Sequence, residues 1–245
     1  MPEVVRVGHK GADALAPGNT LASFDAALRA DVDMIEFDVL PEDHTDRGGS
    51  RLVLCHDYTH DVRRAPSLEE GLAHLAGDAF ADVRLDVDLK LAGYEDRVLA
   101  ALGEHGLLER TLISSMERES LRRLRALAPG VRLGWSVPKA RRDYTASLWT
   151  KVPAGAALLA GRQLFPRRAA IELRNGFCDA IMAYHLLVTP ALADAVRGAG
   201  GELYAWTVDD ADRIRALIGM GVTGVITNDP TLFPARDGRV RITAP

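Results

Sequence analysis

The chain has 245 residues, of which 47% are hydrophobic and 26% are charged, and its formal net charge is −4 at neutral pH. This composition is typical of a globular protein with a full-sized core, and it excludes the basic surface expected of a nucleic-acid-binding protein. The N-terminal sequence lacks the apolar run of a secretion signal, and no segment approaches the ~18 apolar residues of an integral membrane span. We therefore expect a cytoplasmic protein. Two cysteines, Cys55 and Cys178, are too few for a disulfide framework.

Nine short segments have the composition of β-strands, and helical periodicity separates most of them. The predicted strands cover residues 4–9, 34–39, 51–57, 84–90, 111–116, 132–137, 180–187, 202–208 and 224–229. Clear helical patterns cover residues 19–30, 119–128, 189–200 and 209–221. Strands that alternate with helices predict parallel pairing through right-handed crossovers.

The connection between the second and third strands decides the fold prediction. Residues 40–50 are rich in turn formers and too short for a crossover helix, so strand 51–57 should return antiparallel, above the barrel mouth. Eight parallel strands then remain, which predicts an α/β fold: a (β/α)₈ TIM barrel over residues 1–245 as a single domain, with an extra hairpin strand at its C-terminal mouth. An open doubly wound sheet is the alternative, and the missing dinucleotide-binding glycine pattern counts against it.

Polar side chains gather where these strands end, and the C-terminal ends of barrel strands carry active sites. Glu36 and Asp38 are two residues apart and share one face of a strand. The other candidates at this end are His9, His56, Asp57, Asp86, Asp88, Lys90, Trp206, Asn228 and Asp229. Each alone is often structural, but burying unpaired carboxylates is costly, and their common placement favours a functional site.

The residue types indicate chemistry on an anionic substrate. Carboxylates without cysteine or clustered histidine ligands favour a hard cation, Mg²⁺ or Ca²⁺. Two histidines suit general acid and general base catalysis near neutral pH. Lysines beside a cation suit a substrate that gains negative charge in the transition state. A phosphodiester satisfies all three conditions.

At this point a family resemblance emerges from the motifs in their order. "GHKG", "NTLASF", "IEFDV" and "HD" are followed by "DLK", "ERTLISSM", "YAWTVDD" and "GVITNDP". Together they span nearly the whole chain, and their spacing resembles that of the glycerophosphodiester phosphodiesterase family. The resemblance implies a barrel of the phospholipase-C-like type, one divalent cation, and hydrolysis of a glycerophosphodiester to sn-glycerol 3-phosphate and an alcohol.

The same resemblance implies a role for eight residues. His9 and His56 match the family's catalytic pair, and Glu36, Asp38 and Asp88 match its metal ligands. Lys10 and Lys90 would face the phosphate, and Trp206 would line the substrate pocket. The partner is then a small-molecule phosphodiester, with no nucleic acid and no membrane span, and the sequence indicates no oligomeric state.

Four departures from the family pattern bear on the substrate. Lys10 replaces an arginine, Gly18 replaces the glutamate of "PENT", and Asp88 replaces a longer glutamate. The segment between "HDYTHD" and "PSLEE" is also short, which predicts an open mouth. Because "DLK" resembles sphingomyelinase D enzymes, a phospholipase-D-like or cyclising phosphodiesterase acting on lysolipids is an alternative. A binding protein on a decayed barrel is a third reading, and the retained histidines, acids and lysines argue against it.

Overall fold

The computed structural model describes residues 3–138 and 148–236 of the chain. Its strands are β1 Val5–Gly8, β2 Met34–Pro41, β3 Leu52–Leu54, β4 Arg84–Leu89, β5 Thr111–Ser115, β6 Arg132–Val137, β7 Ala180–Tyr184, β8 Glu202–Trp206 and β9 Gly224–Thr227. Its α-helices are α1 Leu21–Arg29, α2 Leu68–Leu75, α3 Glu95–Glu104, α4 Arg118–Leu127, α5 Leu148–Arg174, α6 Pro190–Gly198 and α7 Ala211–Gly219. Three short 3₁₀ turns are η1 Asp78–Phe80, η2 Leu108–Arg110 and η3 Pro230–Leu232. All nine predicted strands and the four predicted helices are present.

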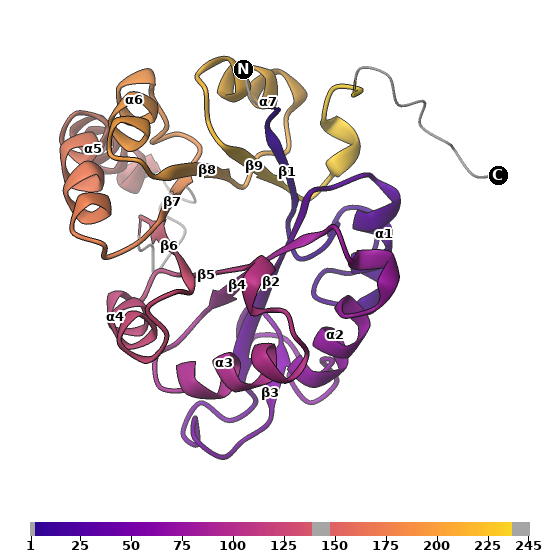
Figure 1. Cartoon of the computed structure of the whole chain (residues 1–245). Coiled ribbons are helices and arrows are strands. Elements are labelled where there is room, and N and C mark those ends of the chain that lie inside the picture. Colours follow the sequence, from indigo (N-terminus) through magenta and orange to yellow (C-terminus); the bar gives the residue numbers. More distant parts are fainter. Residues whose placement is uncertain (1–2, 139–147, 237–245) are drawn as a thin grey trace.

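The sheet closes on itself through its first strand. β1 pairs in parallel with β2 on one side, with Val7 opposite Met34, and with β9 on the other, with Val7 opposite Ile226. The remaining neighbours follow the order β9, β8, β7, β6, β5, β4, β2, so eight parallel strands form a closed ring. Figure 1 shows the helices around the outside of this ring. The predicted (β/α)₈ barrel is confirmed, and the open doubly wound sheet is excluded.

The ninth strand lies outside the ring, as predicted. β3 runs antiparallel to the end of β2, with Leu54 opposite Val39 and Leu52 opposite Pro41. Leu54 also donates its backbone N–H to Pro66, and Val53 bridges Ser67, so both sides of the short strand are tied down. This hairpin returns the chain to the mouth of the barrel.

The alternation of side chains along each strand separates two apolar regions. One set packs beneath the helices and includes Ile35, Phe37 and Val39 of β2. The other set fills the barrel interior: Val5, Val7, Met34, Leu112, Ala180, Met182, Tyr204 and Ile226. Because this interior is packed and apolar, inward-facing polar groups are left to the two ends of the barrel.

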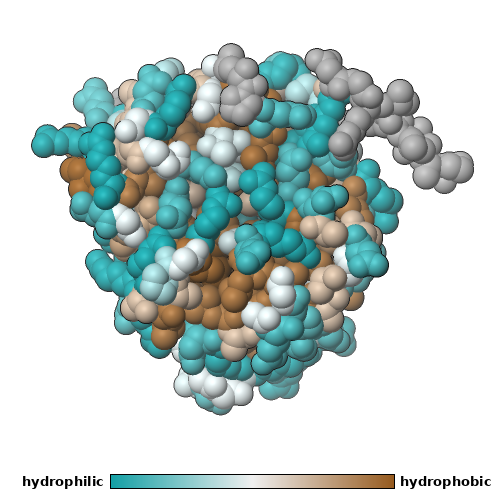
Figure 2. Space-filling model, in the orientation of Figure 1, coloured by the Kyte–Doolittle hydropathy of each residue, from teal (hydrophilic) through white to brown (hydrophobic). Residues whose placement is uncertain are grey.

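Several helices begin at hydrogen-bonded caps that fix where each βα loop ends. Thr20 and Ser67 form capping boxes at the starts of α1 and α2, and Thr189 and Asp210 cap α6 and α7. Figure 2 shows hydrophilic residues around the rim of the face seen in Figure 1, with hydrophobic residues between them toward the middle. Among the described residues, no helix combines the length and hydrophobicity needed to span a membrane.

Candidate active site

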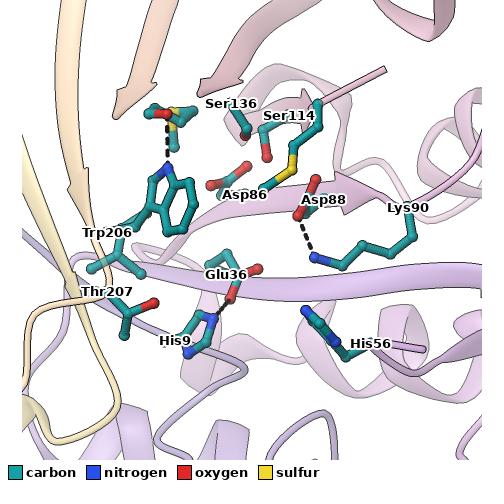
Figure 3. A pocket seen from close by; sticks show the side chains of 13 residues that line it. His9, Glu36, His56, Asp86, Asp88, Lys90, Ser114, Ser136, Trp206 and Thr207 are labelled. Carbon is teal, nitrogen blue, oxygen red and sulfur yellow. Dashed lines mark hydrogen bonds and ion pairs between the residues drawn. The ribbon is translucent and has the colours of Figure 1, made fainter. Parts of the chain in front are cut away.

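A pocket of about 560 Å³, counted out to its open mouth, lies at the C-terminal ends of the barrel strands. It is lined by His9, Glu36, His56, Asp86, Asp88, Lys90, Ser114, Met116, Ser136, Met182, Trp206, Thr207 and Ile226 (Figure 3). Six of the eight residues predicted from the motifs are in this lining. Asp38 is fully buried beside them, and Lys10 is not part of the lining.

A tight turn after β1 brings His9 against β2. The backbone N–H of Lys10 donates to Glu36 Oε2 at 2.8 Å, and that of Gly11 donates to the Glu36 carbonyl at 3.0 Å. Lys10 takes a left-handed conformation, with φ at 51°, to make this turn. Gly8 is required at the end of the strand, since a Cβ there would lie 2.0 Å from the carbonyl oxygen of Gly11. The GHKG sequence is therefore explained by the backbone geometry as well as by its chemistry.

Four buried carboxyl groups come from two adjacent strands. In the register of β2 and β4, Glu36 lies opposite Asp86 and Asp38 lies opposite Asp88. Ligand oxygens of Glu36, Asp38 and Asp88 lie within 4.8 Å of one another. Asp88 Oδ1 is buried and has no hydrogen-bond partner in the described part of the chain. Hard divalent cations prefer oxygen ligands. Three carboxylates that converge, one of them with an oxygen that makes no hydrogen bond among the described residues, therefore fit Mg²⁺ or Ca²⁺.

Lys90 is the ammonium among these acids. Its Nζ lies 2.5 Å from Asp38 Oδ1 and 2.5 Å from Asp88 Oδ2. Burial alone would lower the pKa of Lys90, but Asp38, Asp88 and Glu36 outweigh it and raise that pKa well above its usual value. In turn, burial would raise the pKa of Asp38, but Lys90, His56 and His9 hold it well below the usual range.

Glu36 and Asp86 have pKa values shifted in the opposite direction. Burial, with Asp38 nearby, raises the pKa of Glu36 well above its usual value. Burial, with Asp88 nearby, raises the pKa of Asp86 to about 8. The resemblance to the family assigns no role to Asp86. The period-two pattern of "LDVDLK" nevertheless places it on the same face of the strand as Asp88 and Lys90. Figure 3 shows it beside Ser114 and Ser136, two further lining residues that sequence reasoning missed.

The two histidines of the pocket are held by different hydrogen-bond partners. His9 Nδ1 lies 2.6 Å from Asn228 Oδ1, and its Nε2 lies 3.8 Å from Glu36 Oε2. Burial lowers the pKa of His9, although Asp38 opposes this shift. His56 follows β3, and its Nδ1 lies 3.0 Å from Asp57 Oδ2. The His56 side chain is about half exposed, whereas the His9 side chain is mostly buried. One imidazole of the pocket is therefore open to solvent and the other is largely shielded from it.

Trp206 closes the pocket on the side of β8. Its indole N–H donates to the carbonyl oxygen of Met182 at 2.7 Å, and its ring packs against Tyr184 with 5.6 Å between centroids. Both contacts fix the plane of the indole over the barrel mouth (Figure 3).

The side chain of Lys10 is directed at Asp13 and not into the pocket. Its Nζ lies 3.6 Å from Asp13 Oδ2, away from the pocket lining. The Asp13 carboxylate also accepts the backbone N–H of Gly18 at 2.8 Å. A Cβ at Gly18 would lie 2.6 Å from Asp13 Oδ1 and 2.9 Å from the Cβ of Lys10. Asp13 therefore fills the space in which a side chain at position 18 would begin.

Comparison with known proteins settles the family. The model of the glycerophosphoryl diester phosphodiesterase family matches residues 9–84 and 76–232, which is most of the chain. This chain belongs to that family. The glycerophosphodiester phosphodiesterase of Caldanaerobacter subterraneus subsp. tengcongensis is 24% identical, over 91% of this chain and 93% of its own. A Bacillus subtilis glycerophosphodiester phosphodiesterase is 22% identical, over 94% of this chain and 85% of its own.

Solved structures share the fold of this family member. The glycerophosphodiester phosphodiesterase of Agrobacterium tumefaciens has a TM-score of 0.70 and 21% identity, covering 94% of this chain and 98% of its own. An Oleispira antarctica phosphodiesterase, solved in complex with the product sn-glycerol-3-phosphate, has a TM-score of 0.66 and 20% identity, covering 93% of this chain and 94% of its own. The predicted family, its barrel and its class, the phosphoric diester hydrolases, are confirmed.

Proposed function

We propose that this chain hydrolyses a glycerophosphodiester to sn-glycerol 3-phosphate and an alcohol, using one divalent cation and two histidines. The observation that carries the proposal is a single pocket in which His9, His56 and Lys90 meet three converging carboxylates. The names of the curated relatives and the product held by the Oleispira antarctica enzyme support the same substrate class.

In this proposal Glu36, Asp38 and Asp88 hold Mg²⁺ or Ca²⁺. When bound, the cation would neutralise charge on the phosphoryl oxygens. Lys90 adds a positive charge on the same side, since its ammonium lies among these ligands. Trp206 provides an apolar wall for the substrate, and Lys10 contributes positive potential at the mouth while its amine is held by Asp13.

We assign His9 as the base that takes the proton of the nucleophile and His56 as the acid that protonates the leaving alcohol. A base must be neutral before it acts, and the buried position that lowers the pKa of His9 favours that form. An acid must exchange protons with water between turnovers, and the half-exposed position of His56 allows this.

Substitution of each histidine tests the assignment on two substrates. An alkoxide needs a proton to leave and a nitrophenolate does not, so His56→Ala should lose about 10²–10⁴ in rate on glycerophosphocholine and much less on a nitrophenyl phosphodiester. His9→Ala should slow both reactions alike. If His9→Ala is the variant rescued by the nitrophenyl group, the two roles are exchanged. Near-native rates for both variants on glycerophosphocholine would refute histidine catalysis.

The phospholipase-D-like or cyclising alternative keeps one supporting observation, the aspartate at position 88 in the "DLK" motif. It differs in its nucleophile, because a substrate hydroxyl replaces water. Phosphorus NMR of the products separates the two reactions. We expect a phosphomonoester from glycerophosphocholine at all times, and a stable cyclic phosphate would favour the alternative.

A further inference from the structure

Asp209 lies between β8 and α7 and has no role in the chemistry proposed above. Its carboxylate binds the residues that end β9. Asp209 Oδ1 accepts the backbone N–H of Asn228 at 2.8 Å and the hydroxyl of Thr227 at 3.0 Å. Asp209 Oδ2 accepts the side-chain amide N–H of Asn228 at 2.6 Å. The carboxylate therefore contacts both the backbone and the side chain of the residue that touches His9.

These contacts determine which way the Asn228 amide faces. A carboxylate oxygen can only accept a hydrogen bond, so the amide nitrogen of Asn228 must face Asp209. The amide oxygen of Asn228 is then directed at His9 Nδ1, 2.6 Å away. An amide oxygen also only accepts, so Nδ1 must carry the hydrogen. In the neutral ring the lone pair is then on Nε2, the nitrogen nearer Glu36.

We propose that Asp209 is a positioning residue, which fixes His9 in its Nδ1–H tautomer by orienting the amide of Asn228. The inference rests on the proposed function, in which Nε2 of His9 takes a proton. Without the carboxylate, the Asn228 amide can turn and donate to Nδ1, and the hydrogen of the neutral ring then moves to Nε2. A base with its proton on the wrong nitrogen cannot act. His56 is oriented differently, by direct contact of its Nδ1 with Asp57.

The tautomer can be observed directly, without an activity assay. Long-range proton–nitrogen correlation spectra of the isotope-labelled protein, at a pH where the ring is neutral, distinguish protonated from unprotonated ring nitrogens. The His9 signals are identified by their loss in His9→Gln. We expect Nδ1–H in the wild type and a predominantly Nε2–H ring in Asp209→Asn. On glycerophosphocholine, kcat of Asp209→Asn should fall about 10- to 100-fold, the usual cost of losing such a support.

Two controls separate positioning from loss of structure. Asp194→Asn removes an exposed carboxylate from α6 and should leave the His9 signals unchanged. Thr227→Val removes another contact of Asp209 but keeps the amide contact, so the Nδ1–H form should persist. The double variant Asp209→Asn with Asn228→Asp exchanges the two groups. The new amide at 209 can donate to the new carboxylate at 228, which accepts from Nδ1, so this protein should regain the Nδ1–H form.

The outcomes distinguish this inference from the proposed function. A His9 ring that stays in the Nδ1–H form in Asp209→Asn overturns the positioning role. If Asp209→Asn does not fold, Asn228→Ala tests the same link, and an unchanged Nδ1–H preference there overturns the role as well. A tautomer change in a protein whose wild type hydrolyses no diester supports the positioning role and refutes the proposed function.

Discussion

At the scale of single residues, Asp86 connects the site to the pH dependence of stability. Both of its carboxyl oxygens are buried, and the side-chain hydrogen bond from Ser114 only partly offsets the effect of burial on its pKa. Burial raises its pKa to about 8, whereas an unfolded chain would have a value of about 3.9. Between these values the folded protein keeps a proton that the unfolded chain gives up. The free energy of unfolding therefore falls as the pH rises through this window, and the loss ends above pH 8.

Asp86→Asn should remove this decline. In the presence of a chelator, we expect the variant to exceed the wild type by up to about 5 kcal/mol in unfolding free energy at alkaline pH, since each pKa unit by which folding raises the Asp86 pKa costs about 1.4 kcal/mol once the group ionises. Below the unfolded pKa the two proteins should be nearly equal, because Asp86 is then neutral in both states. Denaturant titrations across the pH range check this, with Asp194→Asn as the exposed control. Parallel stability curves for wild type and Asp86→Asn would contradict it.

Lys90 gives a second prediction at this scale. The ammonium of Lys90 forms ion pairs with both Asp38 and Asp88. In the presence of a chelator, Lys90→Met should therefore lower the free energy of unfolding by about 3–5 kcal/mol. Mg²⁺ or Ca²⁺ should restore part of that loss, so the cation should raise the Tm of Lys90→Met more than that of the wild type. Lys10→Met is the matched control, since the Lys10 ammonium lies 3.6 Å from Asp13 Oδ2, and the contact of Lys10 with Glu36 is made by its backbone N–H. Equal cation-induced Tm shifts in all three proteins would argue against a cation that compensates for the lost charge of Lys90, and no shift in any of them would argue against a cation bound by these carboxylates.

At the scale of elements, the hairpin of β2 and β3 carries one catalytic candidate. Tyr58 follows His56, and its hydroxyl donates to the carbonyl oxygen of Pro41 at 2.6 Å, which ties the loop to the end of β2. Tyr204 makes a comparable bond at the other end of the barrel, where its hydroxyl donates to Glu202 at 2.9 Å. The same substitution can therefore be compared at the two ends.

Tyr58→Phe should reduce kcat on glycerophosphocholine by about 10-fold, within the range that a misplaced catalytic group can cost. Its unfolding free energy should change little, because the residue is partly exposed. Tyr204→Phe should show the reverse, losing about 1 kcal/mol of stability with kcat unchanged. Steady-state kinetics and denaturant unfolding on both variants make the comparison. A larger kcat loss in Tyr204→Phe than in Tyr58→Phe would refute the expectation that Tyr58 supports activity and Tyr204 supports stability.

The strands were largely predictable because they are short segments with the composition of β-strands, and the four predicted helices follow from their helical periodicity. "IEFDV" and "LDVDLK" place their acids on one face from spacing alone, and the turn-rich segment 40–50 predicts the hairpin. The closed ring follows from the count of eight parallel strands that remain once the hairpin strand is set aside.

What spacing does not predict is the direction of side chains beyond the ends of strands. Lys90 turns onto Asp38 of a neighbouring strand, and Lys10 turns onto Asp13 because its backbone takes a left-handed conformation. The link from Asp209 through Asn228 depends on two loops that meet only in the closed barrel. These contacts are tertiary, so no local periodicity encodes them.

At the scale of the whole molecule, the loop between β3 and α2 offers little chain to cover the pocket. Only residues 57–66 separate His56 from the cap of α2, and β3 is three residues long. This loop therefore offers few side chains to contact the alcohol of the substrate. We expect kcat/KM values for glycerophosphocholine, glycerophosphoethanolamine, glycerophosphoinositol and a lysolipid to fall within roughly 10³-fold of one another. A wider spread would show that the site recognises one head group through specific hydrogen bonds.

The space shared by Asp13 and Gly18 couples substitutions at these two positions of the barrel mouth. With Asp13 present, any side chain at position 18 begins 2.6 Å from a carboxylate oxygen, so Gly18→Glu requires the Asp13 side chain to move. With a small residue at position 13, Gly18 loses its hydrogen-bond acceptor, but the space opens. A side chain at position 18 and the Asp13 carboxylate therefore compete for the same space. A small residue at position 13 would also leave the Lys10 ammonium without the Asp13 carboxylate.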